Sequence, residues 1–309
     1  MKPQNVSLEG KTILVTGAAG FIGSNLVLEL LRTTTTIHIV GIDNMNDYYD
    51  VSIKEYRLTQ IEKEVAKHNN SSWTFFKNSI ADREIINKIF TEYKPAVVVN
   101  LAAQAGVRYS ITNPDVYIES NLIGFYNILE ACRHSYDSYD GVAHLVYASS
   151  SSVYGPAGRT DMAYFGFTNK LRAGETIQIF NYGNCKRDFT YVDDIVEGVK
   201  RVMKAAPEKK NGEDGLPIPP YAVYNIGNNQ PENLLEFVDI LQQELIRAEV
   251  LPADYDFDAH KKLVAMQPGD VPVTYADTSA LEADFGFKPD TSLREGLRKF
   301  AEWYKEFYM

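Results

Sequence analysis

The chain has 309 residues, of which 45% are hydrophobic and 23% charged, and a formal net charge of -10 at pH 7. This composition provides enough apolar mass for a sizeable core and excludes an intrinsically disordered chain. Non-specific binding to nucleic acid or to an anionic membrane is also disfavoured, because both need a basic surface. The two cysteines exclude a disulfide scaffold, and no apolar stretch is long enough to span a bilayer. The polar start of the chain lacks a signal segment, so we expect a cytoplasmic protein.

Strand and helix signals alternate along the first half of the chain. Short apolar runs of the length of a buried strand lie at residues 12–16, 37–42, 73–76, 96–100 and 143–148. Between them, apolar residues recur at helical spacing in residues 21–31, 53–68, 82–93 and 116–134. Apolar strands that alternate with helices predict an α/β fold with a parallel sheet covered on both faces.

The second half of the chain is less regular. Residues 154–188 are rich in glycine and predict short irregular elements, and residues 208–220 form a charged loop that is the best candidate for a linker. Helices are expected at residues 193–206, 233–249 and 292–307, and a short strand at residues 222–226. This change of character indicates a second, smaller domain.

A glycine triplet lies between the first predicted strand and the first helix. Gly17, Gly20 and Gly23 have the spacing G-x-x-G-x-x-G, which allows a tight turn and a close approach of a pyrophosphate to the helix N-terminus. Asp43 ends the next strand, where a carboxylate can bind an adenosine ribose hydroxyl, and an acidic residue there favours NAD over NADP. A glycine triplet alone could be a structural turn, but its position between a strand and a helix predicts a dinucleotide site.

Further motifs follow along the chain, and both the motifs and their order are similar to those of a known family. They are Gly41-Ile42-Asp43-Asn44, Asp47-Tyr48-Tyr49-Asp50, the run from Leu101 to Ser110, Asn121, Ser149-Ser150-Ser151-Ser152-Val153-Tyr154-Gly155, the run from Arg187 to Asp194, Tyr224-Asn225-Ile226-Gly227 and the run from Met266 to Val271. From Lys11 to about Tyr304 the chain resembles the extended short-chain dehydrogenase/reductase family of nucleotide-sugar epimerases and dehydratases. It is most similar to the bacterial UDP-glucuronate 4-epimerases of capsular polysaccharide synthesis.

The resemblance implies a Rossmann-type doubly wound parallel sheet with a smaller α/β C-terminal substrate domain. Residues 1–155, with 186–206 returning to them, would bind NAD, and residues 156–185 and 207–309 would bind a UDP-sugar. The implied cofactor-binding residues are Gly17, Gly20, Phe21, Ile22, Gly23, Asp43, Asn44, Ile80, Leu101, Ala102, Ala103, Gln104 and Asn121. The family usually has Gly-Asp-Ile or Gly-Asp-Leu after the third strand, where this chain has Asn78-Ser79-Ile80.

The resemblance also implies residues that contact the sugar nucleotide. Ser150 matches the hydroxyl that shares a hydrogen bond with the reacting sugar oxygen, and Arg187 matches the arginine that grips the UDP phosphates. Arg108, Arg159 and Asp270 are the other implied substrate contacts. Outside this context, Ser150 could bond to a turn backbone and Arg187 could form a surface salt bridge. The five histidines show no ligand spacing, so no metal site is expected.

The catalytic pair of the family is missing. The family places a Tyr-x-x-x-Lys on one helical face, where the lysine ammonium lowers the pKa of the tyrosine that acts as the base. Here Val153-Tyr154-Gly155 runs directly into Pro156, as if a core strand and the catalytic helix had been excised. Tyr182 and Lys186 match the spacing, but Gly183-Asn184 between them predicts a turn. Tyr164 and Lys170 are six residues apart and do not share a helical face.

Three functions stay open on this evidence. The first is an NAD-dependent epimerase acting on the fourth carbon of a UDP-sugar. Ser151-Ser152 stands where the dehydratases have Asp-Glu, and Gln267 stands where glucose-type epimerases usually have an arginine. We therefore expect conversion of UDP-glucuronate to UDP-galacturonate. The second is a catalytically inactive relative that binds NAD and a UDP-sugar. The third is a deletion product that folds poorly and has no function.

We predict that the missing helix also weakens dimerisation. Members of the family usually dimerise through the helices that flank the serine motif, and only the helix at residues 116–134 is left. It would expose Leu122, Phe125 and Leu129, so size-exclusion chromatography should show a weakened or altered homodimer and low solubility. A stable, monodisperse dimer would contradict this expectation.

Overall fold

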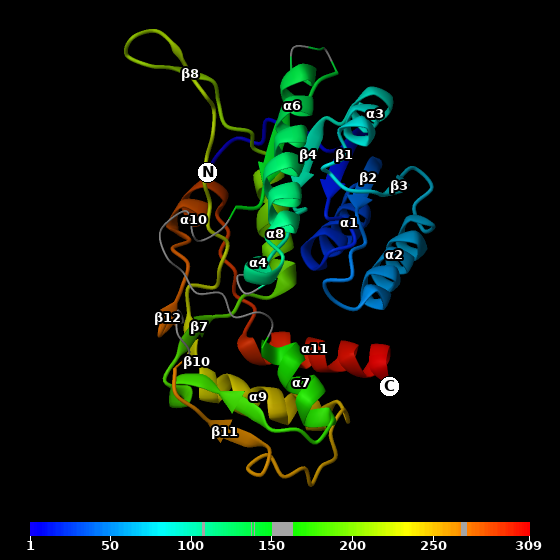
Figure 1. Cartoon of the computed structure of the whole chain (residues 1–309). Coiled ribbons are helices and arrows are strands. Elements are labelled where there is room, and N and C mark those ends of the chain that lie inside the picture. Colours follow the sequence, from blue (N-terminus) through cyan, green and yellow to red (C-terminus); the bar gives the residue numbers. More distant parts are fainter. Residues whose placement is uncertain (107–108, 137, 139, 150–162, 267–270) are drawn as a thin grey trace. The chain divides into compact units, whose positions relative to one another are not determined.

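The computed structural model describes residues 1–106, 109–136, 138, 140–149, 163–266 and 271–309 (Figure 1). The chain divides into two compact units. Unit 1 comprises Met1–Ser149 and Val196–Val223, and unit 2 comprises Ser150–Ile195 and Tyr224–Met309. Helix α8 (Val192–Met203) crosses the boundary between these ranges.

Unit 1 is built on a five-stranded parallel sheet with the strand order β3-β2-β1-β4-β5. After β3 the chain crosses to the other side of β1, so the strand order reverses between β1 and β4. In open α/β sheets this reversal marks the edge at which nucleotides bind. The strands are β1 (Lys11–Thr16), β2 (Ile37–Asp43), β3 (Ser72–Lys77), β4 (Val97–Asn100) and β5 (His144–Tyr147).

The longer helices cover this sheet with buried apolar residues on one face. Helix α1 packs with α2, and α3 packs with α6. Ile86 and Ile89 of α3 and Ile128 of α6 are fully buried in one core cluster with residues of β1, β2 and β4. The other elements of unit 1 are α1 (Phe21–Thr33), α2 (Val51–Val65), α3 (Arg83–Tyr93), α4 (Tyr109–Thr112), α5 (Asp115–Tyr117), the π-helical η1 (Ile118–Gly124), α6 (Phe125–Ser135), β8 (Lys210–Asn211) and β9 (Pro217–Ile218).

Unit 2 has a separate core between α9 (Leu234–Arg247) and α11 (Leu293–Tyr308). Phe237 of α9 stacks on Phe189 with ring centroids 4.6 Å apart, and Tyr304 of α11 is buried in the same cluster. The remaining elements are α7 (Ala163–Arg172), β6 (Ile177–Ile179), the 3-10 turn η3 (Phe180–Gly183), β7 (Lys186–Asp188), β10 (Pro231–Asn233), β11 (Lys261–Leu263), β12 (Val273–Thr274) and α10 (Ser279–Phe285). Strands β10, β7 and β12 form one small sheet, and β11 pairs with β6 in another.

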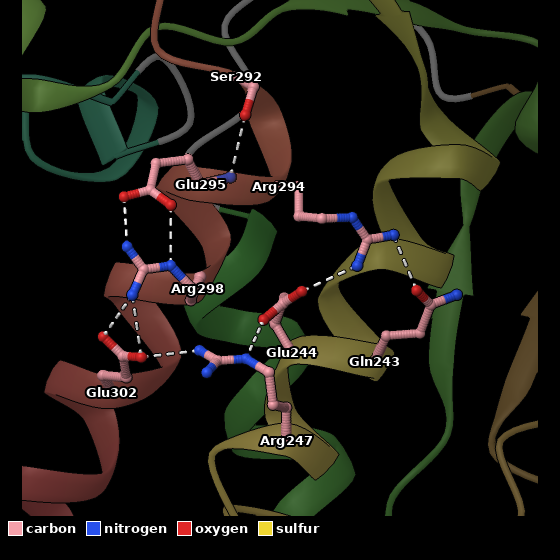
Figure 2. A network of polar contacts seen from close by, with 8 residues as sticks. All are labelled: Gln243, Glu244, Arg247, Ser292, Arg294, Glu295, Arg298 and Glu302. Atoms are coloured by element: carbon pink, nitrogen blue, oxygen red, sulfur yellow. Dashed lines mark hydrogen bonds and ion pairs between the residues drawn. The ribbon is translucent and has the colours of Figure 1, made fainter.

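A network of ion pairs joins α9 to α11 (Figure 2). The buried carboxylate of Glu244 accepts hydrogen bonds from Arg247 at 2.6 Å and Arg294 at 2.8 Å. Arg247 also reaches Glu302 at 2.7 Å, and Arg298 bridges Glu295 and Glu302. Isolated exposed ion pairs contribute little, so the buried apolar stripe supplies most of the stability and the network aligns the two helices.

The sequence predicted the architecture of unit 1 correctly. Each of the five expected strands is present, and the α/β fold class with a parallel sheet is confirmed. The expected helix at residues 116–134 is divided into α5, η1 and α6. The strand predicted at residues 222–226 is wrong, because that segment runs without a ladder partner and exposes Val223.

The sheet of unit 1 ends at β5 within the described residues. The next strand that the structure describes, β6, pairs with β11 in unit 2 instead. Beside this edge, Leu122 is 60% exposed and Leu129 40% exposed, as expected from the sequence. Phe125 is only half-buried rather than exposed, because its ring packs on Tyr147 at a centroid distance of 5.0 Å.

None of the helices in the described part of the chain has the length and apolar character needed to cross a membrane.

The structure predicts a pH dependence for the stability of unit 1. His144 on β5 is buried beside the Met203 carbonyl oxygen, 3.1 Å from its Nδ1, and burial lowers the pKa of its imidazole below 6.5. The unfolded state therefore binds more protons below pH 6.5, and the folded state loses stability as the pH falls. Between pH 7.5 and 5.5, we expect the free energy of unfolding of the wild type to fall by at most about 1.4 kcal/mol through this group. The variant His144→Gln should lack this fall. Urea unfolding at both pH values checks this. A difference in free energy of unfolding between wild type and variant that is the same at both pH values would contradict it.

Candidate functional site

The glycine turn after β1 is packed so closely that side chains do not fit. Gly17 has a φ of +67°, and a Cβ there would lie 2.9 Å from the Ala102 amide nitrogen. A Cβ on Gly23, in the first turn of α1, would lie 2.2 Å from the Gly17 carbonyl oxygen. The turn is closed by the Gly20 amide, which donates to the Gly17 carbonyl at 2.9 Å. Gly17 and Gly20 are half-buried, whereas Ala18 and Ala19 between them are buried.

The N-terminus of α1 is open for an anionic ligand. Gly20 is the N-cap, and it provides no side chain to accept from the first amides of the helix. Phe21 is 36% exposed and Ile22 is half-buried, so the start of α1 reaches the surface, whereas Gly23 and Ser24 are buried. Unpaired amides at a helix N-terminus attract a phosphate by hydrogen bonding and by the helix dipole. Turn and helix together fit a dinucleotide pyrophosphate.

Asp43 braces the glycine turn from the end of β2. Its Oδ2 accepts from the Ala19 amide at 3.2 Å, its Oδ1 accepts from the Met45 amide at 2.9 Å, and Lys54 Nζ lies 3.6 Å from Oδ1. An ionised carboxylate has about four acceptor positions, so capacity remains for a ribose hydroxyl. The neighbouring Asn44 is exposed, and its Oδ1 accepts from the Asn46 amide at 3.1 Å.

Thr16 fixes the loop after β4, a role that the sequence did not reveal. Its buried hydroxyl donates to Asn100 Oδ1 at 2.7 Å and accepts from the amides of Leu101 at 3.2 Å and Ala102 at 3.0 Å. Leu101 and Ala102 are half-buried and Ala103 is exposed. A polar residue at the end of a buried strand was the available signal, since a buried hydroxyl needs partners.

Asn121 and Gln104 form a reciprocal pair at the end of the same loop. The Gln104 amide donates to Asn121 Oδ1 at 2.8 Å, and Asn121 Nδ2 donates to the Gln104 carbonyl at 3.0 Å. Asn121 lies in the π-helical segment η1, and π-helical turns occur often at functional sites. Its amide is used to position the loop that the family resemblance assigns to the nicotinamide.

Ile80 packs closely against η1, and α6 donates a hydrogen bond to its carbonyl oxygen. Asn127 Nδ2 donates to the carbonyl oxygens of Ile80 and Ala81 at 3.0 and 2.9 Å. A Cβ on Gly124 would lie 2.5 Å from Ile80 Cγ1, so η1 approaches Ile80 closely. Ser79, which stands where the family usually has an aspartate, accepts from the Ala81 amide at 3.1 Å and closes the turn.

The structure brings all predicted cofactor residues into unit 1, and of the predicted substrate residues it describes Arg187 alone. Arg187 lies on β7 in unit 2, is buried, and donates from Nη1 to the carbonyl oxygens of Lys186 and Pro272 at 3.0 and 3.3 Å. The other predicted substrate and catalytic residues lie outside the described residues; they are Arg108, Ser150, Arg159 and Asp270.

Neither alternative tyrosine–lysine pair has the required geometry. Tyr182 has a φ of +52° in the turn η3, whereas Lys186 begins β7. The ring of Tyr164 on α7 packs on Phe300 at 4.8 Å, which places it against the core of unit 2. These two pairs therefore present no tyrosine and lysine side by side on a helix.

Comparison with known proteins decides the family. The family model for the NAD-dependent epimerase/dehydratase family matches residues 156–227, and that for GDP-mannose 4,6-dehydratase matches residues 14–163. Protein CapI of Staphylococcus aureus is 40% identical across 96% of this chain and 99% of its own length. The chain belongs to the NAD-dependent epimerase/dehydratase family. This confirms its resemblance to the extended short-chain dehydrogenases/reductases that include the nucleotide-sugar epimerases.

Other members of the NAD-dependent epimerase/dehydratase family extend the comparison. UDP-glucuronate 4-epimerase 4 of Arabidopsis thaliana is 35% identical across 97% of this chain and 76% of its own length. The crystal structure of UDP-glucuronic acid 4-epimerase from Bacillus cereus, in complex with UDP-glucuronic acid and NAD, has a TM-score of 0.75 and 24% identity, covering 96% of this chain and all of its own. UDP-glucose 4-epimerase from Thermotoga maritima, with UDP-glucose, has a TM-score of 0.72 and 22% identity, with 96% and 100% coverage. Both structures share the fold.

The alignment with Protein CapI also contains a difference in length. It runs over 354 positions, whereas this chain has 309 residues in all. The alignment therefore includes positions at which this member of the family has no residue.

The packing of the glycine turn predicts a sharp difference between two glycine variants. Gly23→Ala places a Cβ against the Gly17 carbonyl and should lower the free energy of unfolding of unit 1 by about 1–3 kcal/mol. Gly166, on α7, is the control, because a Cβ there meets nothing within 4 Å and alanine should stabilise the helix by about 0.5–1 kcal/mol. Urea unfolding measures both. Equal stability of Gly23→Ala and wild type would show that the turn is looser than described.

Proposed function

We propose that this protein binds NAD in unit 1 and a UDP-hexuronate, and that it is a UDP-glucuronate 4-epimerase by descent with greatly reduced turnover. The observation that carries the proposal is the combination of the open N-terminus of α1 above the glycine turn with Asp43 at the end of β2. This pair of features fits the pyrophosphate and the adenosine ribose of a dinucleotide.

Each end of the cofactor has residues to hold it. Amides of the first turn of α1 would bind the pyrophosphate, Asp43 the ribose, and the loop from Leu101 to Gln104 would face the nicotinamide. When bound, NAD would accept a hydride from the fourth carbon of the sugar and return it to the opposite face. Arg187 would meet the UDP phosphates, for which a bidentate guanidinium is suited.

The low turnover follows from the absent acid/base pair. The loss of a positioned acid or base costs about 10²- to 10⁴-fold in rate. Two observations support an excision of the segment that carries this pair. The sheet of unit 1 ends at β5 within the described residues, and the alignment with Protein CapI includes positions that this chain lacks. Ser150 would still provide a hydroxyl for the reacting sugar oxygen.

A second candidate is an epimerase of ordinary activity. It is favoured by the identity of 34–40% to Protein CapI and to two Arabidopsis UDP-glucuronate 4-epimerases across nearly the whole chain. Such an enzyme would need another base for the sugar hydroxyl. Neither tyrosine–lysine pair considered above provides one, so we favour the slow relative.

Two measurements on the purified protein test the proposal. Titration with NADH, followed by fluorescence, should show binding, and Asp43→Ala should weaken it about tenfold or more because a charged hydrogen-bond acceptor is removed. Glu55→Ala is the matched control, since it removes an exposed carboxylate from α2. With UDP-glucuronate, NMR should show UDP-galacturonate forming at least about 100-fold more slowly than with an intact relative.

Each outcome separates the candidates. An ordinary rate of epimer formation would establish the active enzyme and refute the slow relative. No NADH binding by a protein with a native near-UV circular dichroism spectrum would refute the cofactor site. A molten spectrum without binding would identify a deletion product that does not fold.

A further inference from the structure

A buried lysine joins the two ends of the proposed cofactor site. Lys54 lies in the first turn of α2, and its side chain is only 5% exposed. All three donors of its ammonium group have acceptors nearby: Asp43 Oδ1 at 3.6 Å, and the carbonyl oxygen and Oδ1 of Asn46 at 3.1 and 2.8 Å. The ammonium is therefore fully engaged by the protein, and its action on a ligand must be indirect.

This position is unfavourable for a lysine on two counts. Burial disfavours the charged ammonium and lowers the pKa of Lys54, and a cation near the N-terminus of a helix is opposed by the helix dipole. Replacing a buried ion pair by apolar residues is often neutral or stabilising, so stability alone is a weak reason for the pair. The contacts of Lys54 indicate a role in the site.

The contacts continue from Lys54 to the loop after β4. Asn46 Nδ2 donates to Gln104 Oε1 at 3.2 Å, and Gln104 is held in turn by its reciprocal pair with Asn121. On the other side, Asp43 accepts from the amide of Ala19 in the glycine turn. One continuous set of polar contacts thus runs from the turn after β1, through Lys54, to the loop after β4.

We infer that Lys54 is a positioning residue that sets the geometry at both ends of the cofactor site. It orients Asp43 for the adenosine ribose and, through Asn46, places Gln104 on the nicotinamide side. The inference rests on the proposed function, because it assigns these two ends to NAD. It adds a residue far from the nicotinamide that controls how the nicotinamide is held.

The test uses the full chain, NADH as the probe, and Lys54→Met, which keeps the length of the side chain and removes its charge. We expect the dissociation constant for NADH to rise about tenfold, because hydrogen bonds of a charged group are lost. At saturating NADH, the emission maximum of the bound nicotinamide should also shift, since Gln104 loses its support. Lys63→Met removes an exposed lysine from the same helix and should change neither quantity.

A second variant separates positioning from general destabilisation. Asn46→Ala leaves the contacts of Lys54 with Asp43 and with the main-chain carbonyl of residue 46, and it removes the side-chain amide that accepts from Lys54 and donates to Gln104. It should reproduce the emission shift with a smaller loss of affinity, and adding it to Lys54→Met should produce little further change, because both act through one network. If Lys54→Met fails to fold, Asn46→Ala alone decides through its emission shift.

The outcomes distinguish this inference from the proposed function. Binding of NADH by wild type with unchanged affinity in Lys54→Met would overturn the inference and leave the proposed function standing. Weaker binding in Lys54→Met with an unchanged emission of the bound nicotinamide would limit Lys54 to the adenosine end and overturn the coupling. A folded wild type that binds no NADH would overturn both.

Discussion

The close approach of two main-chain turns is the constraint on which the site in unit 1 depends. The turn after β1 and the loop after β4 meet where the strand order reverses, and a Cβ on Gly17 would lie 2.9 Å from the Ala102 amide. The hydroxyl of Thr16 accepts from two amides of the same loop and so holds the approach in place. Without glycine at this point the two turns would separate, and the amides at the start of α1 would no longer face a common ligand.

Buried polar side chains around this approach act mainly on the protein main chain. Asp43 bonds to the glycine turn, Asn121 to the loop at Gln104, and Asn127 to the carbonyls at Ile80 and Ala81. Each satisfies backbone groups that burial would otherwise leave without partners, which is costly. Residues assigned to ligand contact by family resemblance therefore also build the site, and removing one is expected to change both binding and stability.

The proposed cofactor binding and the chemistry of the family depend on different parts of the chain. The proposed binding depends on turns and strand ends of unit 1 that lie within the described residues. The family resemblance assigns the chemistry to a tyrosine and a lysine on one helix. Of the two pairs considered above, Tyr182 and Lys186 are divided between a turn and a strand, and Tyr164 packs into the core of unit 2. A nucleotide site built from main-chain amides does not depend on such a pair of side chains.

By itself, the sequence determined the alternation of strands and helices, the glycine turn, Asp43 at a strand end and the lack of a helical Tyr-x-x-x-Lys. These features are local: they follow from periodicity, from the conformational freedom of glycine and from residue spacing. Only the tertiary structure decided that Lys54, Asn46 and Gln104 form one network, that Thr16 anchors the loop after β4, and that residues 222–226 lack a strand partner. The contacts of Asn46 with Gln104 and of Thr16 with Ala102 join residues far apart in the chain. Their partners are set by how the sheet orders its strands rather than by any local pattern.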